Sequence, residues 1–138
     1  MVDLKPHNKE NYQKIKQMFQ SGKKICAISQ ATGTGKTYLI AKLCEDYADM
    51  KKIIIAPNNY ILDQTKEKFT EYGITKTDFM TYQKLIKMKD EEISDMDLDL
   101  IVLDEFHHTT SKVWGEKVDQ LLSSHTGALI FGTSATPV

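Results

Sequence analysis

The segment that most limits the possible folds of this chain is a glycine-rich stretch between two apolar ones. Residues 30–37 read Gln-Ala-Thr-Gly-Thr-Gly-Lys-Thr. The apolar run Ile25–Ile28 lies one residue before it and is typical of a short buried strand. Tyr38–Cys44 follows and has the composition of a helix. A strand, a glycine loop and a helix in this order predict an α/β unit with a phosphate-binding loop at its turn.

This loop has the residue types needed to hold a nucleotide. Its backbone N–H groups and the N-terminus of the following helix present partial positive charge to phosphate oxygens. Lys36 can reach the β- and γ-phosphates and act in catalysis, and the Thr37 hydroxyl can bind Mg²⁺. Gln30 stands where the general pattern has a glycine, so a plain glycine turn without a ligand is the alternative interpretation. The predicted nucleotide-binding residues of the loop are Thr32, Gly33, Thr34, Gly35, Lys36 and Thr37.

The composition is that of one ordinary globular domain. The chain has 138 residues, of which 41% are hydrophobic and 27% are charged, which is enough for one core. We therefore expect a single domain over residues 1–138. No apolar run approaches the ~20 residues that a membrane-spanning helix needs, and the first residues lack the apolar core of a signal peptide. A cytoplasmic location is the expectation.

Charged and sulfur-containing residues restrict the possible sites further. The net charge of −1 gives no overall basic field for nucleic acid. All 18 basic residues are lysines, so a mechanism that needs a guanidinium must obtain it from another chain or segment.

Cys26 lies in a predicted strand and Cys44 on a predicted helix, which gives no metal-ligand spacing. We expect both to be buried, reduced thiols.

Predicted strands alternate with predicted helices along the whole chain. This alternation indicates a three-layer α/β/α domain with a mainly parallel sheet of about five strands, in which ligands bind beyond the carboxyl ends of the strands. The polar stretch 89–97 is expected to be a solvated loop. The predicted strands are 24–29, 51–56, 77–80, 98–103 and 128–131, and the predicted helices are 7–20, 38–48, 60–72, 82–88 and 114–123.

A second chemical site follows one of the predicted buried strands. The apolar run Leu100–Leu103 ends at Asp104 and Glu105, which is the form of a Walker B element. Asp104 can hold Mg²⁺, usually through a water, and Glu105 can orient and deprotonate the water that attacks the γ-phosphate. A lone Asp-Glu pair after a strand is often structural. The glycine loop earlier in the chain favours the catalytic interpretation.

Together these motifs resemble the first RecA-like domain of a superfamily 2 helicase or translocase, a P-loop NTPase. Within that group the chain is most similar to restriction-enzyme motor subunits and their DNA repair relatives. The resemblance covers about residues 4–137, and in it the first glycine of the loop pattern is commonly replaced. The matching segments are Leu4–Asn8, Ala31–Thr37, Pro57–Gln64, Thr81–Gln83, Asp104–His107 and Ser134–Thr136.

The resemblance implies roles for several further residues. His107 would couple the nucleotide site to the last of these motifs and act with the catalytic residues. Ser134 and Thr136 would relay the nucleotide state to the nucleic-acid side. Asn8 stands where the family has the glutamine that reads adenine, so it is the expected base-binding residue.

Contact with nucleic acid in this family uses backbone amides and hydroxyls at the sheet edge, independent of base sequence. The expected contacts are Asn58, Asn59, Thr81 and Tyr82, for which ordinary turn chemistry is the alternative. A DNA substrate is favoured over RNA because the residues of these motifs resemble those of restriction-enzyme motor subunits.

In this family a second RecA-like domain carries the arginine fingers. The present sequence resembles the first domain and contains no arginine. An arginine finger contributes ~10³–10⁵ in rate. We therefore expect the chain to be the ATP-binding half of an ATP-dependent helicase or translocase, an enzyme with ATP and Mg²⁺ as cofactors, and to hydrolyse ATP very slowly alone. The alternative is a standalone nucleotide- or nucleic-acid-binding module without turnover.

Overall fold

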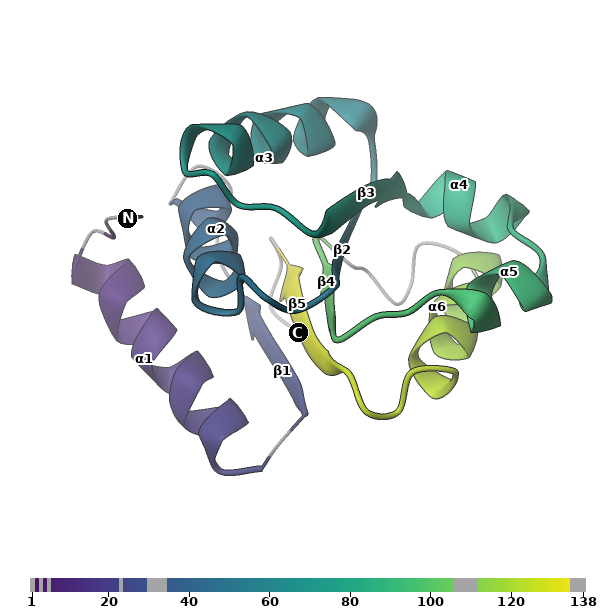
Figure 1. The fold of residues 1–138 in the computed structure, drawn as a ribbon, viewed down its shortest axis with the longest axis horizontal. Helices are drawn as coiled ribbons and strands as arrows, with labels where there is room; N and C mark the ends of the chain where they lie inside the picture. Colours follow the sequence, from purple (N-terminus) through teal and green to yellow (C-terminus); the bar gives the residue numbers. More distant parts are fainter. Residues whose placement is uncertain are drawn as a thin grey trace.

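A computed structural model describes residues 2, 4, 6–22, 24–29, 35–105 and 112–134 of the chain. In this part, helices and strands alternate as the sequence predicts, except that two helices instead of one precede the fourth strand (Figure 1). The strands are β1 Ile25–Ser29, β2 Lys52–Ala56, β3 Thr77–Thr81, β4 Leu100–Leu103 and β5 Leu129–Ser134. The helices are α1 Pro6–Gln20, α2 Lys36–Asp46, α3 Asn59–Glu71, α4 Tyr82–Lys87, α5 Asp90–Asp95 and α6 Lys112–Ser123. Among the described helices, none combines the length and apolar character needed to cross a membrane.

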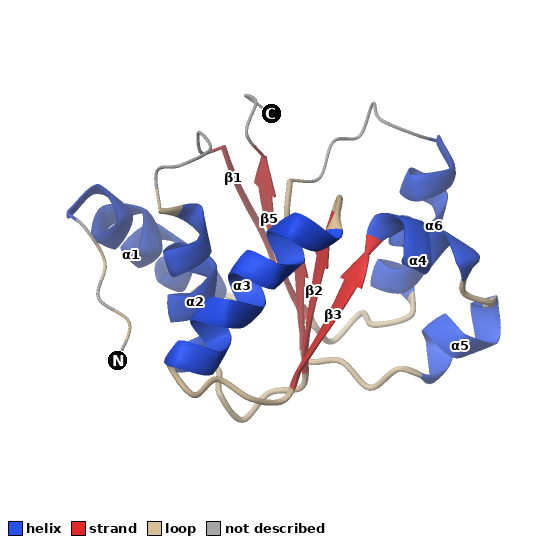
Figure 2. Cartoon of the chain, turned by 90° about the horizontal axis from the view of Figure 1, so that it is seen from above, coloured by secondary structure: helices blue, strands red, loops and turns tan. Residues whose placement is uncertain are grey.

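Five described strands form one parallel sheet in the order β1-β5-β4-β2-β3. Figure 2 shows the sheet nearly edge-on, with α1, α2 and α3 on one face and α4, α5 and α6 on the other. The expected three-layer α/β/α architecture is therefore confirmed, and every strand pair is parallel. The C-terminal ends of all strands lie at one edge, where the polar motifs follow them.

Both faces of the sheet are packed against helices, because alternate residues of a strand point to opposite sides. On β2, Ile54 and Ala56 belong to the core beside α1, α2 and α3, whereas Ile53 and Ile55 belong to the core beside α4 and α6. All four side chains are fully buried. The continuous apolar runs thus reflect strands covered on both faces.

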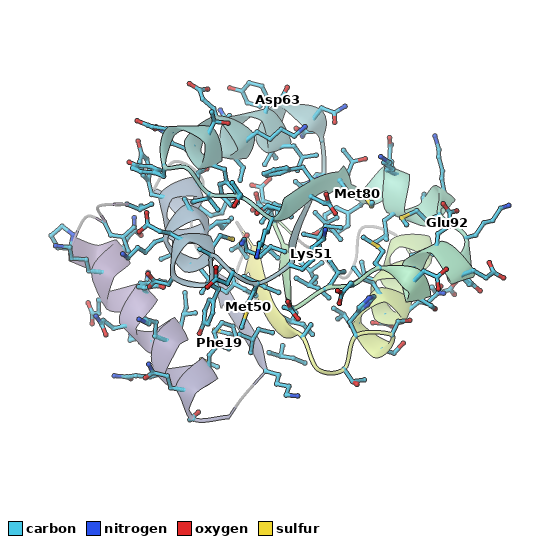
Figure 3. The ribbon with its side chains drawn as sticks, in the orientation of Figure 1. Phe19, Met50, Lys51, Asp63, Met80 and Glu92 are labelled. Carbon is cyan, nitrogen blue, oxygen red and sulfur yellow. The ribbon has the colours of Figure 1, made fainter. Side chains whose placement is uncertain are left out.

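The first of these two cores also receives side chains from α1 and from the turn after α2. Figure 3 shows Phe19 and Met50 in the region between α1, α2 and the sheet, whereas Asp63 on α3 and Glu92 on α5 lie at the outside. Phe19 is buried and Met50 packs against the same cluster. The thiols of Cys26 and Cys44 are free and buried, as expected.

One lysine lies inside the sheet. Lys52 at the start of β2 is fully buried, and its ammonium donates to the carbonyl oxygens of Tyr47, Ala48 and Met50 at 3.3, 3.1 and 3.0 Å. These carbonyls belong to the end of α2 and the turn after it, where helices leave acceptors unsatisfied. Burial lowers the pKa of Lys52. The Lys52 ammonium therefore caps the C-terminal end of α2, the helix that follows the glycine loop.

The stretch 89–97 differs from its prediction as a solvated loop, because it contains the short helix α5. The backbone N–H of Lys89 donates to Glu92 Oε1 at 3.0 Å, which caps the first turn. Ile93 is fully buried in the core beside α4 and α6. Ile93 and Met96 are the only apolar residues of this stretch, which is too few to show a helical period, and Ile93 is the buried residue of the helix.

Candidate active site

The N-terminus of α2 directly follows the glycine loop. Gly35 precedes the helix with φ of 90°, in the left-handed region that favours glycine. A Cβ on Gly35 would lie 2.3 Å from Nδ2 of Asn8, so the Asn8 side chain is packed against this glycine. Asn8 is 1% exposed. The structure therefore places Asn8 against the loop end of α2, with its amide enclosed by protein.

Lys36, the first residue of α2, forms ion pairs with both members of the acidic pair. Its Nζ lies 3.0 Å from Asp104 Oδ1 and 3.1 Å from Glu105 Oε1. The three side chains are 9%, 2% and 16% exposed, so the interactions lie largely away from solvent. The structure thus joins the two motifs that the sequence predicts to act together.

The Asp104 backbone is held by two neighbouring elements. Its N–H donates to Ile55 O on β2 at 2.7 Å, and its carbonyl accepts from the Tyr82 hydroxyl at 3.1 Å. Tyr82 is fully buried, and burial together with the nearby Asp104 charge raises its pKa. The hydroxyl therefore stays protonated and remains a donor. Asp104 is anchored to β2 and to the start of α4 at once.

Thr133 on β5 is a site residue that the sequence analysis missed. It is 2% exposed, and its hydroxyl donates to Asp104 Oδ1 at 2.8 Å. The same hydroxyl accepts from the backbone N–H of Glu105 at 3.1 Å. The sequence assigned residue 133 to the segment leaving the last strand, whereas β5 continues through Ser134. A parallel pairing of β5 with β4 would have pointed to it, because Leu103 pairs with Gly132.

Glu105 adopts an uncommon backbone conformation. Its φ is 51°, in the left-handed region, which costs an L-residue about 1–2 kcal/mol. The turn after β4 therefore needs support from its surroundings, and the hydrogen bond from the Glu105 N–H to Thr133 provides part of it. This turn directs the Glu105 carboxylate to Lys36.

The residues present fit a magnesium ion that would take some of its ligands from the protein and the others from a nucleotide and water. Among the described residues, the hydrogen bond and ion pair of the Asp104 carboxylate both meet at Oδ1. The described residues contain no group of three His, Cys, Asp or Glu able to hold a metal without other ligands. Mg²⁺ is commonly bound by one or two protein oxygens together with phosphates and waters. Asp104 is the protein ligand that this arrangement offers, and Thr37, in the first turn of α2, stays a ligand predicted from the sequence.

The expected nucleic-acid contacts lie at the same edge of the sheet. The Asn58 side chain accepts from Ile61 N at 3.0 Å and caps α3, and the Thr81 hydroxyl accepts from Lys84 N at 3.2 Å and caps α4. Asn58 and Asn59 are exposed and Thr81 is partly exposed. The fully buried Tyr82 does not reach the surface, so the expected contact by its side chain is corrected here to a core position beneath Asp104.

Several expected site residues lie outside the part of the chain that the structure describes. Ser134 is the last residue of β5, and its backbone alone is described. The roles expected for these residues therefore stay predictions from the sequence. Those outside the described residues are Thr32, Gly33, Thr34, His107 and Thr136.

Among the solved structures that share this fold are two that cover most of this chain. The crystal structure of T4 UvsW superposes with a TM-score of 0.70 at 19% identity, over 91% of this chain and 29% of that one. The nuclease-deletion mutant of the Type ISP restriction-modification enzyme LlaGI, in complex with a DNA substrate mimic, superposes with a TM-score of 0.66 at 15% identity. That match covers 98% of this chain and 18% of the other. The chain thus spans less than a third of either protein.

Family membership rests on the sequence itself. No protein of the curated collection matches the chain. The family described as "Type III restriction enzyme, res subunit" matches residues 1–138 in full. This match and the shared fold confirm the resemblance to the first RecA-like domain of a restriction-type superfamily 2 helicase. The chain belongs to the type III restriction enzyme res subunit family.

Proposed function

We propose that this chain is the ATP-binding part of an ATP-dependent DNA helicase or translocase. The observation that carries the proposal is the position of Lys36 at the N-terminus of α2, 3.0 Å from Asp104 Oδ1 and 3.1 Å from Glu105 Oε1. A lysine, a helix N-terminus and an acidic pair converge there, which is the set of groups that phosphoryl transfer from a nucleotide requires.

The site residues have separate tasks in this proposal. The free N–H groups of the first turn of α2 bind phosphate oxygens. Lys36 exchanges its two carboxylate partners for the β- and γ-phosphates. Asp104 and Thr37 hold Mg²⁺, which neutralises charge on the phosphates when bound. Glu105, released from Lys36, accepts a proton from the attacking water.

Coupling to movement requires a second RecA-like domain, which we propose to be supplied by a longer parent chain or a partner. All 18 basic residues of this sequence are lysines, so any arginine finger comes from elsewhere. Its absence would reduce hydrolysis by a factor of ~10³–10⁵. We therefore expect these 138 residues to bind nucleotide and to turn it over very slowly.

DNA is the proposed nucleic acid because the family description names a restriction enzyme and LlaGI was solved with a DNA substrate mimic. The proposed contact surface consists of Asn58, Asn59 and Thr81, which lie at the carboxyl ends of β2 and β3. Polar groups at this edge suit phosphate contacts that are independent of base sequence.

Nucleotide binding to the chain tests the first part of the proposal. Affinity for Mg-ATP is measured by calorimetry for the wild type, for Lys36→Ala and for Lys42→Ala. Lys42 lies on the same helix but pairs with Glu45 and Asp46, so its removal is the matched control. We expect binding by the wild type and by Lys42→Ala, and none by Lys36→Ala. Equal affinity of all three proteins would refute the assignment of Lys36.

Turnover tests the second part and uses the full-length gene product. DNA-stimulated ATP hydrolysis is compared between the wild type and Glu105→Gln, which keeps the shape of the side chain and removes its basicity. We expect nucleotide binding to persist and hydrolysis to stop. Unchanged hydrolysis would remove Glu105 as the base, and a wild type that binds but never hydrolyses ATP would favour a binding module.

A further inference from the structure

Thr133 occupies a position from which one side chain can control both acids of the site. It follows Gly132, which pairs with Leu103 in the parallel ladder between β5 and β4. It therefore lies level with Asp104, the first residue after β4. The side chain is 2% exposed, so its hydroxyl interacts with protein groups and is shielded from bulk water.

The direction of the two hydrogen bonds at this hydroxyl is fixed. A backbone N–H can only donate, so the Thr133 oxygen accepts from Glu105 N at 3.1 Å. Its single hydrogen then points to Asp104 Oδ1, at 2.8 Å. A hydroxyl that bonds a carboxylate makes a charge-assisted hydrogen bond, which is stronger than a neutral one. Thr133 therefore fixes the Asp104 carboxylate and the Glu105 backbone through one oxygen atom.

Lys36 holds the same Asp104 oxygen, at 3.0 Å, but this contact competes with nucleotide binding. When Lys36 moves to the phosphates, Asp104 Oδ1 loses the ammonium and keeps the Thr133 hydroxyl. The left-handed turn at Glu105, with φ of 51°, keeps its hydrogen bond to Thr133 in the same way. Among the described residues, Thr133 is thus the partner of the Asp104 carboxylate that does not compete with the nucleotide.

We propose that Thr133 is the positioning residue of this site, and that its hydroxyl orients Asp104 for Mg²⁺ and sets the direction of Glu105. This rests on the proposed function, because it assigns a metal-binding task to Asp104. Partners that orient a ligating carboxylate typically change metal affinity ~10–100-fold when they are removed. The effect of losing the hydroxyl should therefore appear in the dependence of nucleotide binding on Mg²⁺.

The test measures the affinity of the chain for a fluorescent, non-hydrolysable ATP analogue at increasing Mg²⁺. Thr133→Val keeps the shape of the side chain and removes the hydroxyl, and Thr133→Ser restores the hydroxyl. Thr65→Val is the matched control, because Thr65 is also buried and donates its hydroxyl hydrogen to Ile61 O within α3, away from the site.

Added Mg²⁺ should raise the affinity for the analogue, and the Mg²⁺ concentration that gives half of this increase is the quantity compared. We expect this concentration to be ~10–100-fold higher for Thr133→Val than for the wild type. Thr133→Ser and Thr65→Val should stay within about threefold of the wild type, which corresponds to about 0.7 kcal/mol, because both variants keep a hydroxyl at position 133. An Mg²⁺ requirement of Thr133→Val equal to that of the wild type would overturn the proposal. So would a Thr133→Ser variant as impaired as Thr133→Val, since the hydroxyl would then be irrelevant.

Failure of the proposed function and misfolding of a variant can both be told apart from failure of the Thr133 proposal. A wild type that binds no nucleotide would refute the proposed function itself. Circular dichroism checks the fold of each variant, and Thr133→Ala replaces Thr133→Val if the branched apolar side chain is not tolerated. The same shift in Mg²⁺ requirement is expected for Thr133→Ala, and its absence counts equally against the proposal.

Discussion

Lys36 Nζ lies 3.0 Å from Asp104 Oδ1, although the two residues are 68 positions apart in the chain (104 − 36). The contact joins the first residue of α2 to the residue after β4. Because the Asp104 side chain is only 2% exposed, its charge depends on protein groups for compensation. This relationship makes the stability of the domain and the proposed nucleotide binding depend on the same atoms.

Removing the ammonium of Lys36 should therefore destabilise the fold. We expect Lys36→Ala to lower the free energy of unfolding by about 3–5 kcal/mol, because two carboxylates lose their shared cation in a largely buried place. Asp104→Asn added to Lys36→Ala should recover part of the loss, since an amide needs no counter-charge. Urea unfolding of both variants measures this. A double variant no more stable than Lys36→Ala would show that the Asp104 charge is compensated in another way.

Gly35 should tolerate alanine less well than a comparable glycine. Gly73 also has a positive φ, 68°, but a Cβ there would meet no atom within 4 Å, so Gly73→Ala should cost only about 1–2 kcal/mol of backbone strain. At Gly35 the Cβ would also lie 2.3 Å from Asn8 Nδ2. Chemical denaturation should show a larger loss for Gly35→Ala. Equal losses would mean that Asn8 moves aside without cost.

The hydroxyl of Tyr82 should contribute to stability through the backbone of Asp104. Tyr82→Phe leaves a buried carbonyl without its donor, which typically costs about 1–3 kcal/mol. Tyr60→Phe is the control, because Tyr60 is 72% exposed and its change should stay within about 0.5 kcal/mol. Thermal unfolding of the two variants gives the comparison. A Tyr82→Phe protein as stable as the wild type would show that water or another group replaces the hydroxyl.

The buried thiol of Cys44 should make the domain sensitive to alkaline pH. Burial raises the pKa of Cys44 from 9.0 to about 12. The folded-state pKa is above the unfolded one, so the contribution of the thiol is complete below pH 9 and is lost between about pH 9 and 12. Over that window the loss approaches 1.4 kcal/mol per pH unit.

Other groups titrate in the same range, so Cys44→Val serves as the reference. The difference in free energy of unfolding between wild type and Cys44→Val, measured by urea denaturation at each pH, should fall as the pH rises from 9 to 12. A difference that is independent of pH would show that the thiolate is tolerated in this core.

Local sequence was sufficient for most elements because their apolar residues follow the period of the structure they form. Ile53, Ile54 and Ile55 form a run that only a strand covered on both faces would bury, and all three are buried. The prediction of a loop over residues 89–97 was wrong, because α5 contributes a single buried residue, Ile93, to the core. A helix with one buried side chain leaves almost no periodic signal.

The sequence by itself determined the glycine loop, the acidic pair after a buried strand and the family, because each is written in consecutive residues. Only the tertiary structure decided which strands are neighbours, and with that which side chains meet. The place of β5 between β1 and β4 brings Thr133 to Asp104 and Glu105, and the start of α4 places Tyr82 beneath them. These contacts join residues 22–29 positions apart, and such pairings arise from sheet order and packing, which local residue patterns do not encode.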